Sequence, residues 1–353
     1  MGLPSVGQPF VSGSVESPAG KIPQVSSSLT WADRMGSYKA RWGIGRMQYT
    51  VEPGLYALGN PNDKSPVLAT ANYKMSFDRL RKALPAWNAW ILVLETKGIN
   101  VWCAAGKGTF GTMEIVERIV SSGLDRLVSH REIILPQLSG PGVAPHHVKK
   151  LSGFRVIYGP VRAEDLPAFL NRGMKATPEM RLKTFTLWER AVLVPVELVA
   201  ALKVALVVIP ILMTLSGLLG PSDFWSNIRE HGLFVLPAIM TAILAGAVLT
   251  PLFLPVLPGR AFSLKGLLLG VMGALSLLFF RWDQMMLWSV RLEMIAWFLL
   301  IPAGATYLSM NFTGASTYTS LSGVKKEMRL ALPLQIGACI AGLVLWMSSI
   351  IVP

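Results

Sequence analysis

Cysteine is scarce in this chain of 353 residues, which has only Cys103 and Cys339. Two cysteines separated by a long and largely apolar stretch cannot build the disulfide framework of a small secreted domain. They also cannot supply the four thiolates that hold a structural zinc ion or an iron–sulfur cluster. Any iron–sulfur redox chemistry therefore has to come from a partner protein.

Charged residues are also few, at 15% of the chain, against 52% hydrophobic residues and a mean hydropathy of +0.48. Two soluble domains would be less apolar, so part of the chain is expected to lie in lipid. The charge is concentrated early, because residues 1–190 hold 24 of the 33 Lys and Arg residues. A soluble domain is therefore predicted to precede a membrane domain.

The net charge of +13 lacks the pattern of a nucleic-acid-binding protein, because the basic residues are scattered and no basic patch is interleaved with aromatic residues. Attraction to anionic lipid headgroups explains the positive charge more simply, so the expected partner of this protein is a lipid bilayer and not nucleic acid. The start of the chain lacks a basic stretch followed by an apolar run, so no secretory signal is predicted. Residues 1–30 are rich in Ser, Pro and Gly and are predicted to be a disordered lead-in.

Long hydrophobic runs are confined to the second half of the chain. Residues 233–257 and 330–352 are uncharged and long enough to cross a bilayer core of roughly 30 Å. Three further runs are short or carry charges. Lys203 lies near the end of one run, and Arg291 and Glu293 lie within another. We predict five transmembrane helices, at Leu198–Leu219, Leu233–Leu257, Gly266–Phe280, Met285–Leu308 and Leu330–Val352.

Basic residues beside these spans predict their orientation. Several basic residues precede the first span. Lys325, Lys326 and Arg329 precede the fifth. Both flanks are therefore expected to face the cytoplasm, so that the protein lies in the inner membrane with its soluble domain inside and its C-terminus outside. Arg291 and Glu293 are two residues apart and point to different helix faces, which does not indicate an ion pathway.

Short apolar runs alternate with helical stretches from about Thr50, which predicts a layered α/β domain with a Rossmann-like sheet. Ser76 and Thr112 are expected to cap two of its helices, the second with Met113 and Val120 among the residues facing the core. The predicted strands are Val67–Thr70, Trp90–Leu94, Ile133–Leu135 and Val156–Tyr158. The predicted division is an α/β domain at 31–175, a juxtamembrane linker at 176–197 and an all-α transmembrane domain of five helices at 198–353.

The segment from Asn100 to Thr109, between a predicted strand and a predicted helix, stands out. It is not a P-loop, because Val101 stands where the first glycine belongs and Gly108 stands where the magnesium-binding hydroxyl belongs. Elsewhere, residues 43–45 lack the third glycine of a dinucleotide fingerprint. A cysteine nucleophile with a histidine base is conceivable, but nothing local orients such a pair.

Residues 100–107, with the sequence NVWCAAGK, resemble the cap-helix motif of the mercury-methylating corrinoid membrane proteins, the HgcA family. In that family the cysteine is the lower axial ligand of cobalt, and five transmembrane helices follow the corrinoid domain. The similarity extends to Arg41–Arg46, Pro53–Pro61, Thr70–Tyr73, Leu135–Gly142 and Tyr158–Arg162. It covers nearly the whole chain after the N-terminal lead-in.

The corrinoid iron–sulfur protein of the acetyl-CoA pathway shares the same corrinoid domain. It carries its own cysteine-ligated cluster and no membrane spans, and this chain departs from both features. The separate signature Asp-x-His-x-x-Gly is absent, because no Asp stands two residues before any of the four histidines. A histidine-ligated cobalt is therefore not expected.

The resemblance implies that Cys103 binds the cobalt of a corrinoid and that Thr70 lies over its upper face. Small residues in the cap segment would let the corrin ring approach, although they are also common in tight turns. Lys107 could hold a corrin amide or be a solvated lysine, and the glycines near the strand ends could contact the corrinoid or only form turns. The implied cofactor-binding residues are Thr70, Asn72, Asn100, Val101, Trp102, Cys103, Ala104, Ala105, Gly106, Lys107, Gly108, Gln137, Ser139, Gly140, Gly142 and Gly159.

The same resemblance implies a methyltransferase that passes a methyl group from cobalt to Hg(II), since a thiolate is a soft, electron-donating ligand. A corrinoid methyl carrier of one-carbon metabolism with a different acceptor remains the alternative. The implied partners are a small ferredoxin-type iron–sulfur protein as electron donor and a methyltetrahydrofolate-linked methyl donor protein.

Overall fold

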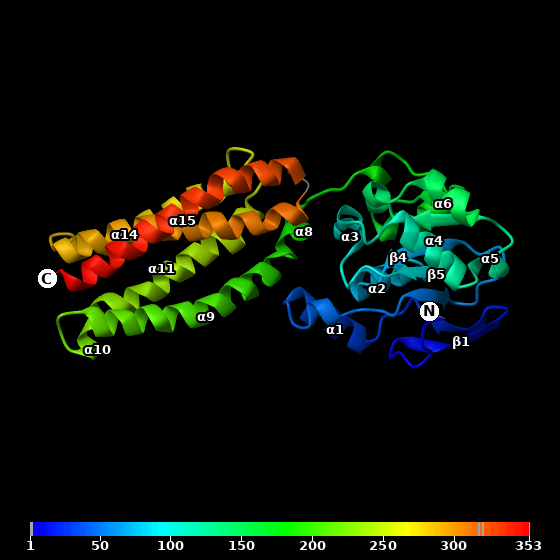
Figure 1. The fold of residues 1–353 in the computed structure, drawn as a ribbon, viewed down its shortest axis with the longest axis horizontal. Coiled ribbons are helices and arrows are strands. Elements are labelled where there is room, and N and C mark those ends of the chain that lie inside the picture. The colour runs from blue at the N-terminus through cyan, green and yellow to red at the C-terminus, as the bar shows by residue number, and fades with distance from the viewer. Residues whose placement is uncertain (1–2, 317, 320, 353) are drawn as a thin grey trace. The chain divides into compact units, whose positions relative to one another are not determined.

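The computed structural model describes residues 3–316, 318–319 and 321–352. The chain forms two compact units, residues 1–183 and 184–353 (Figure 1). The first is an α/β unit and the second is helical, which confirms the predicted fold class. Pro353, which the sequence placed outside the membrane, lies outside the described residues.

Unit 1 is built on one seven-stranded sheet in the order β1-β2-β3-β5-β4-β6-β7. Strand β4 pairs in parallel with β5 and β6, and β6 pairs in parallel with β7. Strand β3 is antiparallel to β5 and parallel to β2, which forms an antiparallel pair with β1. The strands are β1 Val11–Ser17, β2 Gly20–Val25, β3 Gly54–Leu58, β4 Val67–Ala71, β5 Ala89–Leu94, β6 Glu132–Leu135 and β7 Arg155–Tyr158.

Helices and short 3-10 turns connect these strands and cover the sheet. Successive residues of β5 face two different apolar clusters, with Leu92 in one and Ile91 in the other, as expected for a strand covered on both sides. The helices are α1 Trp31–Arg41, α2 Lys74–Lys82, α3 Val101–Lys107, α4 Thr112–Ser121, α5 Leu124–Leu127, α6 Pro145–Ser152 and α7 Leu166–Asn171, with 3-10 turns η1 Arg46–Gln48, η2 Gln137–Gly142, η3 Ala163–Asp165 and η4 Glu179–Arg181.

The four predicted strands of unit 1 are confirmed as β4 to β7, but two helix caps are wrong. Helix α2 begins at Lys74 after Tyr73, two residues before the expected cap. Helix α4 is preceded by Gly111, so that Thr112 is its first residue. The face of α4 also differs from the prediction, because Met113 and Val120 are 57% and 66% exposed. The buried face of α4 is shifted to Ile115, Val116 and Ile119.

The first thirty residues do not form the disordered lead-in that their composition predicted. Residues 11–25 form the antiparallel pair β1 and β2, and β2 joins the sheet beside β3. Ile22 and Val25 are buried in the two apolar clusters. The Ser, Gly and Pro content concealed a short alternation of apolar residues, and the partner strand that stabilises it lies thirty residues further along.

The border between the units also differs from the predicted linker at 176–197. Residues 176–183 belong to unit 1, where Ala176 and Met180 pack against the apolar core. The Met180 carbonyl accepts a hydrogen bond from the Val161 amide at 2.8 Å. Helix α9 begins at Val194, four residues before the predicted start of the first span.

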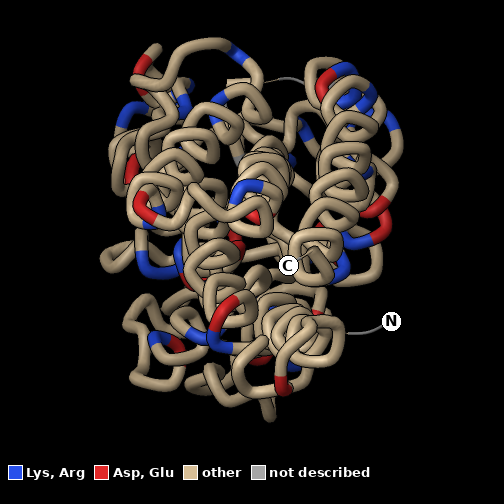
Figure 2. The backbone as a smooth tube through the Cα atoms, turned by 90° about the vertical axis from the view of Figure 1, so that its left-hand side faces the viewer, with Lys and Arg blue, Asp and Glu red and all other residues tan. Residues whose placement is uncertain are grey.

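Among the described residues, unit 2 contains five helical segments that are long and apolar enough to cross a membrane, at residues 187–219, 224–252, 262–280, 288–314 and 322–351. Each includes an 18-residue stretch with at most two charged residues. Figure 2 marks the charged residues along the whole backbone. Two π-helical stretches interrupt the second segment. The elements are α8 Leu187–Ala191, α9 Val194–Leu219, α10 Phe224–Asn227, η5 Ile228–Gly232, α11 Leu233–Ile243, η6 Leu244–Leu249, α12 Thr250–Leu252, α13 Phe262–Phe280, η7 Trp282–Gln284, α14 Trp288–Met310, η8 Asn311–Ala315 and α15 Leu321–Ile351.

Candidate functional site

Most of the predicted site residues meet at one edge of the sheet of unit 1. Strands β4, β5, β6 and β7 run in parallel, so their carboxyl ends lie at the same edge. Thr70 and Asn72 are at the end of β4, helix α3 follows β5, η2 follows β6 and Gly159 follows β7. Ligands of open α/β sheets bind at this edge, and α3 contacts both η2 and β4 there.

Asn72 organises the loop that leads from β5 to α3. Its Oδ1 atom accepts hydrogen bonds from the Thr96 hydroxyl at 2.7 Å and from the Gly98 amide at 3.0 Å. Its Nδ2 atom donates to Glu95 at 2.9 Å. Both ends of the buried Asn72 amide are therefore engaged within the protein, and these hydrogen bonds hold the loop in place.

Helix α3 is short and is fixed at both ends. Asn100 caps its start, because its side chain accepts a hydrogen bond from the Cys103 amide at 2.9 Å. Gly108 ends the helix in the left-handed conformation, with φ of 78°. Ala104 and Ala105 are buried against the core, whereas Cys103 is half-buried and forms no disulfide. The same geometry that buries the two alanines leaves the thiol accessible at the edge of the sheet.

The neighbours of Cys103 differ in burial. Val101 belongs to the core, and Trp102 is half-buried. Lys107 is exposed. An added Cβ on Gly106, on Gly108 or on Gly140 of the facing turn would meet no atom within 4 Å. These three glycines therefore border open space, which suits the close approach of a large planar ligand.

Turn η2 packs directly on α3. A Cβ added to Gly142 would lie 2.3 Å from the Phe110 carbonyl oxygen and 3.0 Å from the Ala105 Cα atom, so only glycine fits there. Ser139 is fully buried, and its hydroxyl donates to the Pro136 carbonyl at 2.8 Å. These contacts fix the distance between α3 and the ends of the strands.

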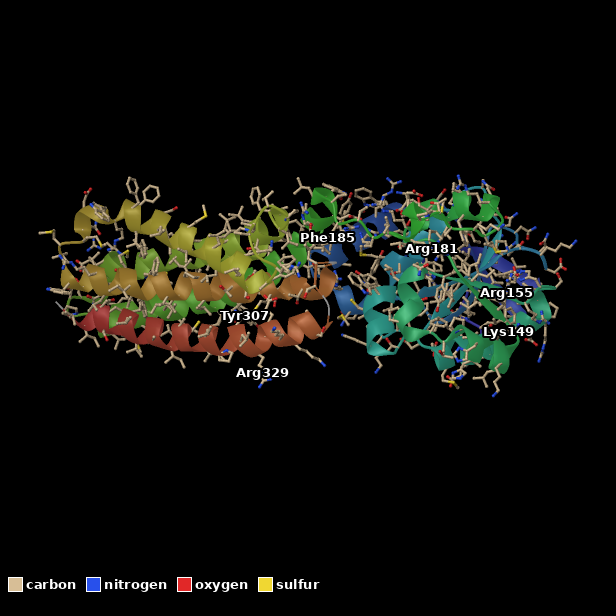
Figure 3. The ribbon with its side chains drawn as sticks, turned by 90° about the horizontal axis from the view of Figure 1, so that it is seen from above. Lys149, Arg155, Arg181, Phe185, Tyr307 and Arg329 are labelled. Carbon is tan, nitrogen blue, oxygen red and sulfur yellow. The ribbon has the colours of Figure 1, made fainter. Side chains whose placement is uncertain are left out.

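Two other predicted residues flank this contact. Gln137 accepts a hydrogen bond at 2.6 Å from Arg181, a residue labelled in Figure 3. Gly159 is buried, and its amide donates to the Leu135 carbonyl at 2.8 Å, which extends the pairing of β6 and β7. A Cβ there would approach Ile134 to 3.1 Å. Gly159 thus serves the close packing of the strand ends.

The histidines do not form a pair with Cys103 at this edge. His130 precedes β6, at the opposite end of the parallel strands, where its Nε2 atom lies 3.0 Å from the Ser65 carbonyl oxygen. His146 and His147 are exposed on α6 and lie against one another. No group of three or more His, Cys, Asp or Glu side chains able to hold a metal ion occurs among the described residues.

A buried ion network beside the site was missed from the sequence. The Lys74 ammonium lies 2.6 Å from Asp33 and 2.8 Å from Asp78, and the Arg81 guanidinium lies 2.7 Å from Asp33. Burial alone would raise the pKa of Asp33, but hydrogen bonds from Lys74 and Arg81 outweigh it and hold that pKa well below its ordinary value. The sequence signal that could have predicted this network is the spacing of Lys74, Asp78 and Arg81, which places them on one helix face.

The phenol of Tyr49 lies beside this network. It donates to the Asp33 carbonyl oxygen at 3.0 Å. Burial and the neighbouring carboxylates of Asp78 and Asp33 raise the pKa of Tyr49 to about 12. The network therefore links α1, α2 and the segment after η1 through four ion-paired side chains.

Residues 44–170 match the family described as CO dehydrogenase/acetyl-CoA synthase delta subunit. The matched region contains every predicted site residue, from Thr70 to Gly159. Fold and match together make unit 1 similar to the corrinoid-binding domains of this family, and five apolar helices follow it among the described residues.

Individual relatives agree with this assignment. The acetyl-CoA decarbonylase/synthase complex subunit gamma of Methanopyrus kandleri is 30% identical over 124 residues, which are 35% of this chain and 26% of that protein. The corresponding subunit of Methanocaldococcus jannaschii is 36% identical over 96 residues, 27% of this chain and 20% of that protein. The corrinoid/iron-sulfur protein large subunit of Moorella thermoacetica is 28% identical over 121 residues, 34% and 27% of the two chains. The chain therefore spans about a quarter of the length of these relatives.

Proposed function

We propose that this protein is a membrane-anchored corrinoid methyl-transfer protein in which Cys103 is the lower ligand of the cobalt. The observation that carries the proposal is the accessible thiol of Cys103 on a short, doubly fixed helix, within the region that matches the corrinoid-protein family. A bound corrinoid supplies a cobalt that accepts and releases a methyl group. The open space beside Gly106, Gly108 and Gly140 fits such a ligand.

The chain's own residues hold the ligand thiol in place. Asn100 and Gly108 fix the two ends of α3, and the loop bonds of Asn72 fix its approach. A thiolate needs this support, because a shift of about 1 Å in a metal ligand changes coordination. Thr70, almost fully buried at the end of β4, is proposed to face the methyl-bearing side.

The remaining predicted contacts are proposed to act in three ways. Val101, Ala104 and Ala105 anchor α3 in the core. Trp102 and Lys107, which are not fully buried, are proposed to contact the corrinoid directly. Gln137, Ser139, Gly140, Gly142 and Gly159 form the turns at the strand ends, where they shape the floor of the site.

Two methyl acceptors have separate support. The comparisons favour a methyl carrier of one-carbon metabolism, since the relatives are named as subunits of acetyl-CoA decarbonylase/synthase complexes. The motif around Cys103 favours Hg(II), because electron donation from a thiolate suits transfer to a soft electrophile. We propose Hg(II) as the acceptor to test first, with a carbon acceptor as the second candidate.

The proposed partners follow from the same chemistry. The chain lacks the cysteines for a cluster, so a ferredoxin-type iron–sulfur protein would return the cobalt to its low-valent state. A methyltetrahydrofolate-linked protein would supply the methyl group. We also propose that the corrinoid domain is cytoplasmic and that the five helices hold it at the inner membrane.

The Cys103→Ala variant tests the proposal. We expect it to fold and bind less corrinoid, and the visible absorption of the bound corrinoid should change because the sulfur ligand is lost. Methyl transfer to Hg(II) and to a carbon acceptor should fall at least a hundredfold, since ligand and outer-shell changes at metal sites cost about 10- to 100-fold or more.

The matched control is Cys339→Ala, which removes the other thiol from the apolar helix α15. It should leave the visible spectrum and both transfer rates unchanged. Cys103→His should bind corrinoid but transfer slowly to Hg(II), because imidazole donates less charge than thiolate. An unchanged spectrum and near wild-type transfer in Cys103→Ala would overturn the proposed role.

A further inference from the structure

A large groove lies in the helical unit, where α14 packs against both α13 and α15. Its cavity volume is about 1210 Å³. The walls are mostly apolar and include Leu264, Leu267, Phe298, Leu330 and Leu334, several of which are otherwise exposed side chains. The groove is therefore open to whatever surrounds the helices.

Two buried polar groups line this apolar groove. Thr306 on α14 and Gln335 on α15 are 7% and 6% exposed. The Thr306 hydroxyl and the Gln335 Oε1 atom have no hydrogen-bond partner within the described part of the chain. An unpaired buried polar group destabilises a fold, so the pair indicates an occupant with its own polar atoms.

The mouth of the groove is cationic. Arg260 and Lys326 line it, and neither forms an ion pair with another described residue. The one acid there, Glu327, accepts a hydrogen bond from the Ser263 amide at the start of α13 and is engaged in that contact. With two cations and one carboxylate, the net charge at the mouth of the groove is +1.

Charge, polar groups and apolar surface follow one another along the groove. Lys326 and Gln335 are nine residues apart on α15, which is about 13 Å along the helix. Apolar side chains continue the wall beyond the polar pair, among them Phe298, which is eight residues before Thr306 on α14. This order is that of an amphiphile, with an anionic head, a polar neck and a hydrocarbon tail.

We propose that this groove binds one anionic phospholipid of the bilayer. Its phosphate lies between Arg260 and Lys326, an ester carbonyl accepts a hydrogen bond from Thr306, and an acyl chain follows the leucine wall. A lipid without a phosphate would leave the two cations without a partner, and in phosphatidylcholine the choline cation competes with them for the phosphate. The proposal is independent of the chemistry assigned to Cys103.

Native mass spectrometry of the full-length protein, released from detergent micelles, tests this. Titration with phosphatidylglycerol should give one retained lipid per chain, with phosphatidylcholine retained much more weakly. The double variant Arg260→Gln/Lys326→Gln should weaken phosphatidylglycerol binding by roughly tenfold to thirtyfold, since each basic residue contributes about a fivefold factor near an anionic lipid.

The matched control is Lys325→Gln/Arg329→Gln, which also removes two positive charges, both from α15. Neither residue lines the groove, and Arg329 points away from the helices (Figure 3). The control should bind phosphatidylglycerol like the wild type. Equal losses in the two double variants would show that only diffuse charge is involved and would overturn the proposal.

A second variant separates binding from folding. Thr306→Val has the same shape and removes an unpaired buried hydroxyl, so the lipid-free protein should melt at the same or a higher temperature. The rise in melting temperature that phosphatidylglycerol causes should be smaller than in the wild type. An undiminished rise, or equal retention of phosphatidylcholine and phosphatidylglycerol by the wild type, would overturn the proposal, as would a co-purifying protein helix that excludes lipid.

Discussion

Single residues decide how α1 and α2 are held beside the site. Asp33 and Asp78 are almost fully buried, yet each meets a cation within 3 Å, so their charges are compensated. Desolvation of a buried ion pair costs several kcal/mol, which only good geometry offsets. Removing one of the four side chains leaves the charges of its partners uncompensated. The loss of any one of them should therefore destabilise the fold.

The Asp33→Asn variant tests this at the residue scale. We expect the free energy of unfolding to fall by about 3–5 kcal/mol at pH 7, because Lys74 and Arg81 lose a shared carboxylate. Since the pKa of Asp33 is lower in the folded protein, the wild type should lose this contribution as pH falls below about 4. The variant should lack that part of the acid sensitivity.

Urea unfolding of the full-length protein in detergent, from pH 7 to pH 3, measures both effects. Glu16→Gln is the control, because its ion pair with Lys21 is mostly exposed and should contribute little. A variant as stable as the wild type at pH 7 would contradict the structural role of the network.

Among the elements, α3 matters most, because it carries Cys103 and has only seven residues. An isolated helix of this length is unstable, so its position depends on contacts from outside. The loop held by Asn72 fixes its start, and η2 supports its side through Gly142. The position of α3 is therefore fixed by the neighbouring loop and by η2, and not by the helix propensity of its own residues.

The Gly142→Ala variant tests the support that η2 gives to α3. The added methyl group would collide with the Phe110 carbonyl and the Ala105 backbone, so we expect a loss of about 1–3 kcal/mol in the free energy of unfolding. Amide hydrogen exchange within α3 should accelerate, because the contact that protects it has loosened. Gly140→Ala, which meets open space two residues away, should change neither quantity. Equal effects of both variants would rule out the proposed contact.

At the scale of the whole molecule, the chain divides into a polar α/β unit and an apolar helical unit. The basic residues before α9 and near the start of α15 predict that these ends face the cytoplasm. Because the number of candidate spans is odd, the two ends of unit 2 should lie on opposite sides of the membrane.

Reporter fusions check this topology. Alkaline phosphatase is active only outside the cytoplasm, so a fusion after Arg190 should be inactive and a fusion after Val352 should be active. A fusion after Gly220, between the first two spans, should also be active, and one after Gly259 should be inactive. The reverse pattern at Arg190 and Val352 would overturn the orientation.

The sequence by itself determined the features that depend on local pattern. Apolar runs predicted all five candidate spans, although only two of the runs are long and uncharged, and the predicted ends differ from those of the structure by 0 to 11 residues. Apolar runs of three to five residues predicted β4 to β7. Strands β4 and β5 are buried on both faces, whereas β7 at the edge of the sheet is exposed or half-buried along its length. The resemblance of residues 100–107 to a cap-helix motif placed a helical segment after β5, where the structure has α3, but the roles of Asn100 and Gly108 at its two ends were not predicted.

Only the tertiary structure decided the features that depend on partners distant in sequence. Residues 11–25 became strands because β3 offers an edge to β2, which no local composition could reveal. Asn72 became a support of the Cys103 loop because Thr96 and Gly98 present their donors to it. The pairing of Asp33 with Lys74 and Arg81 spans 41 and 48 residues, and burial of such charges is favourable only once all partners are in place.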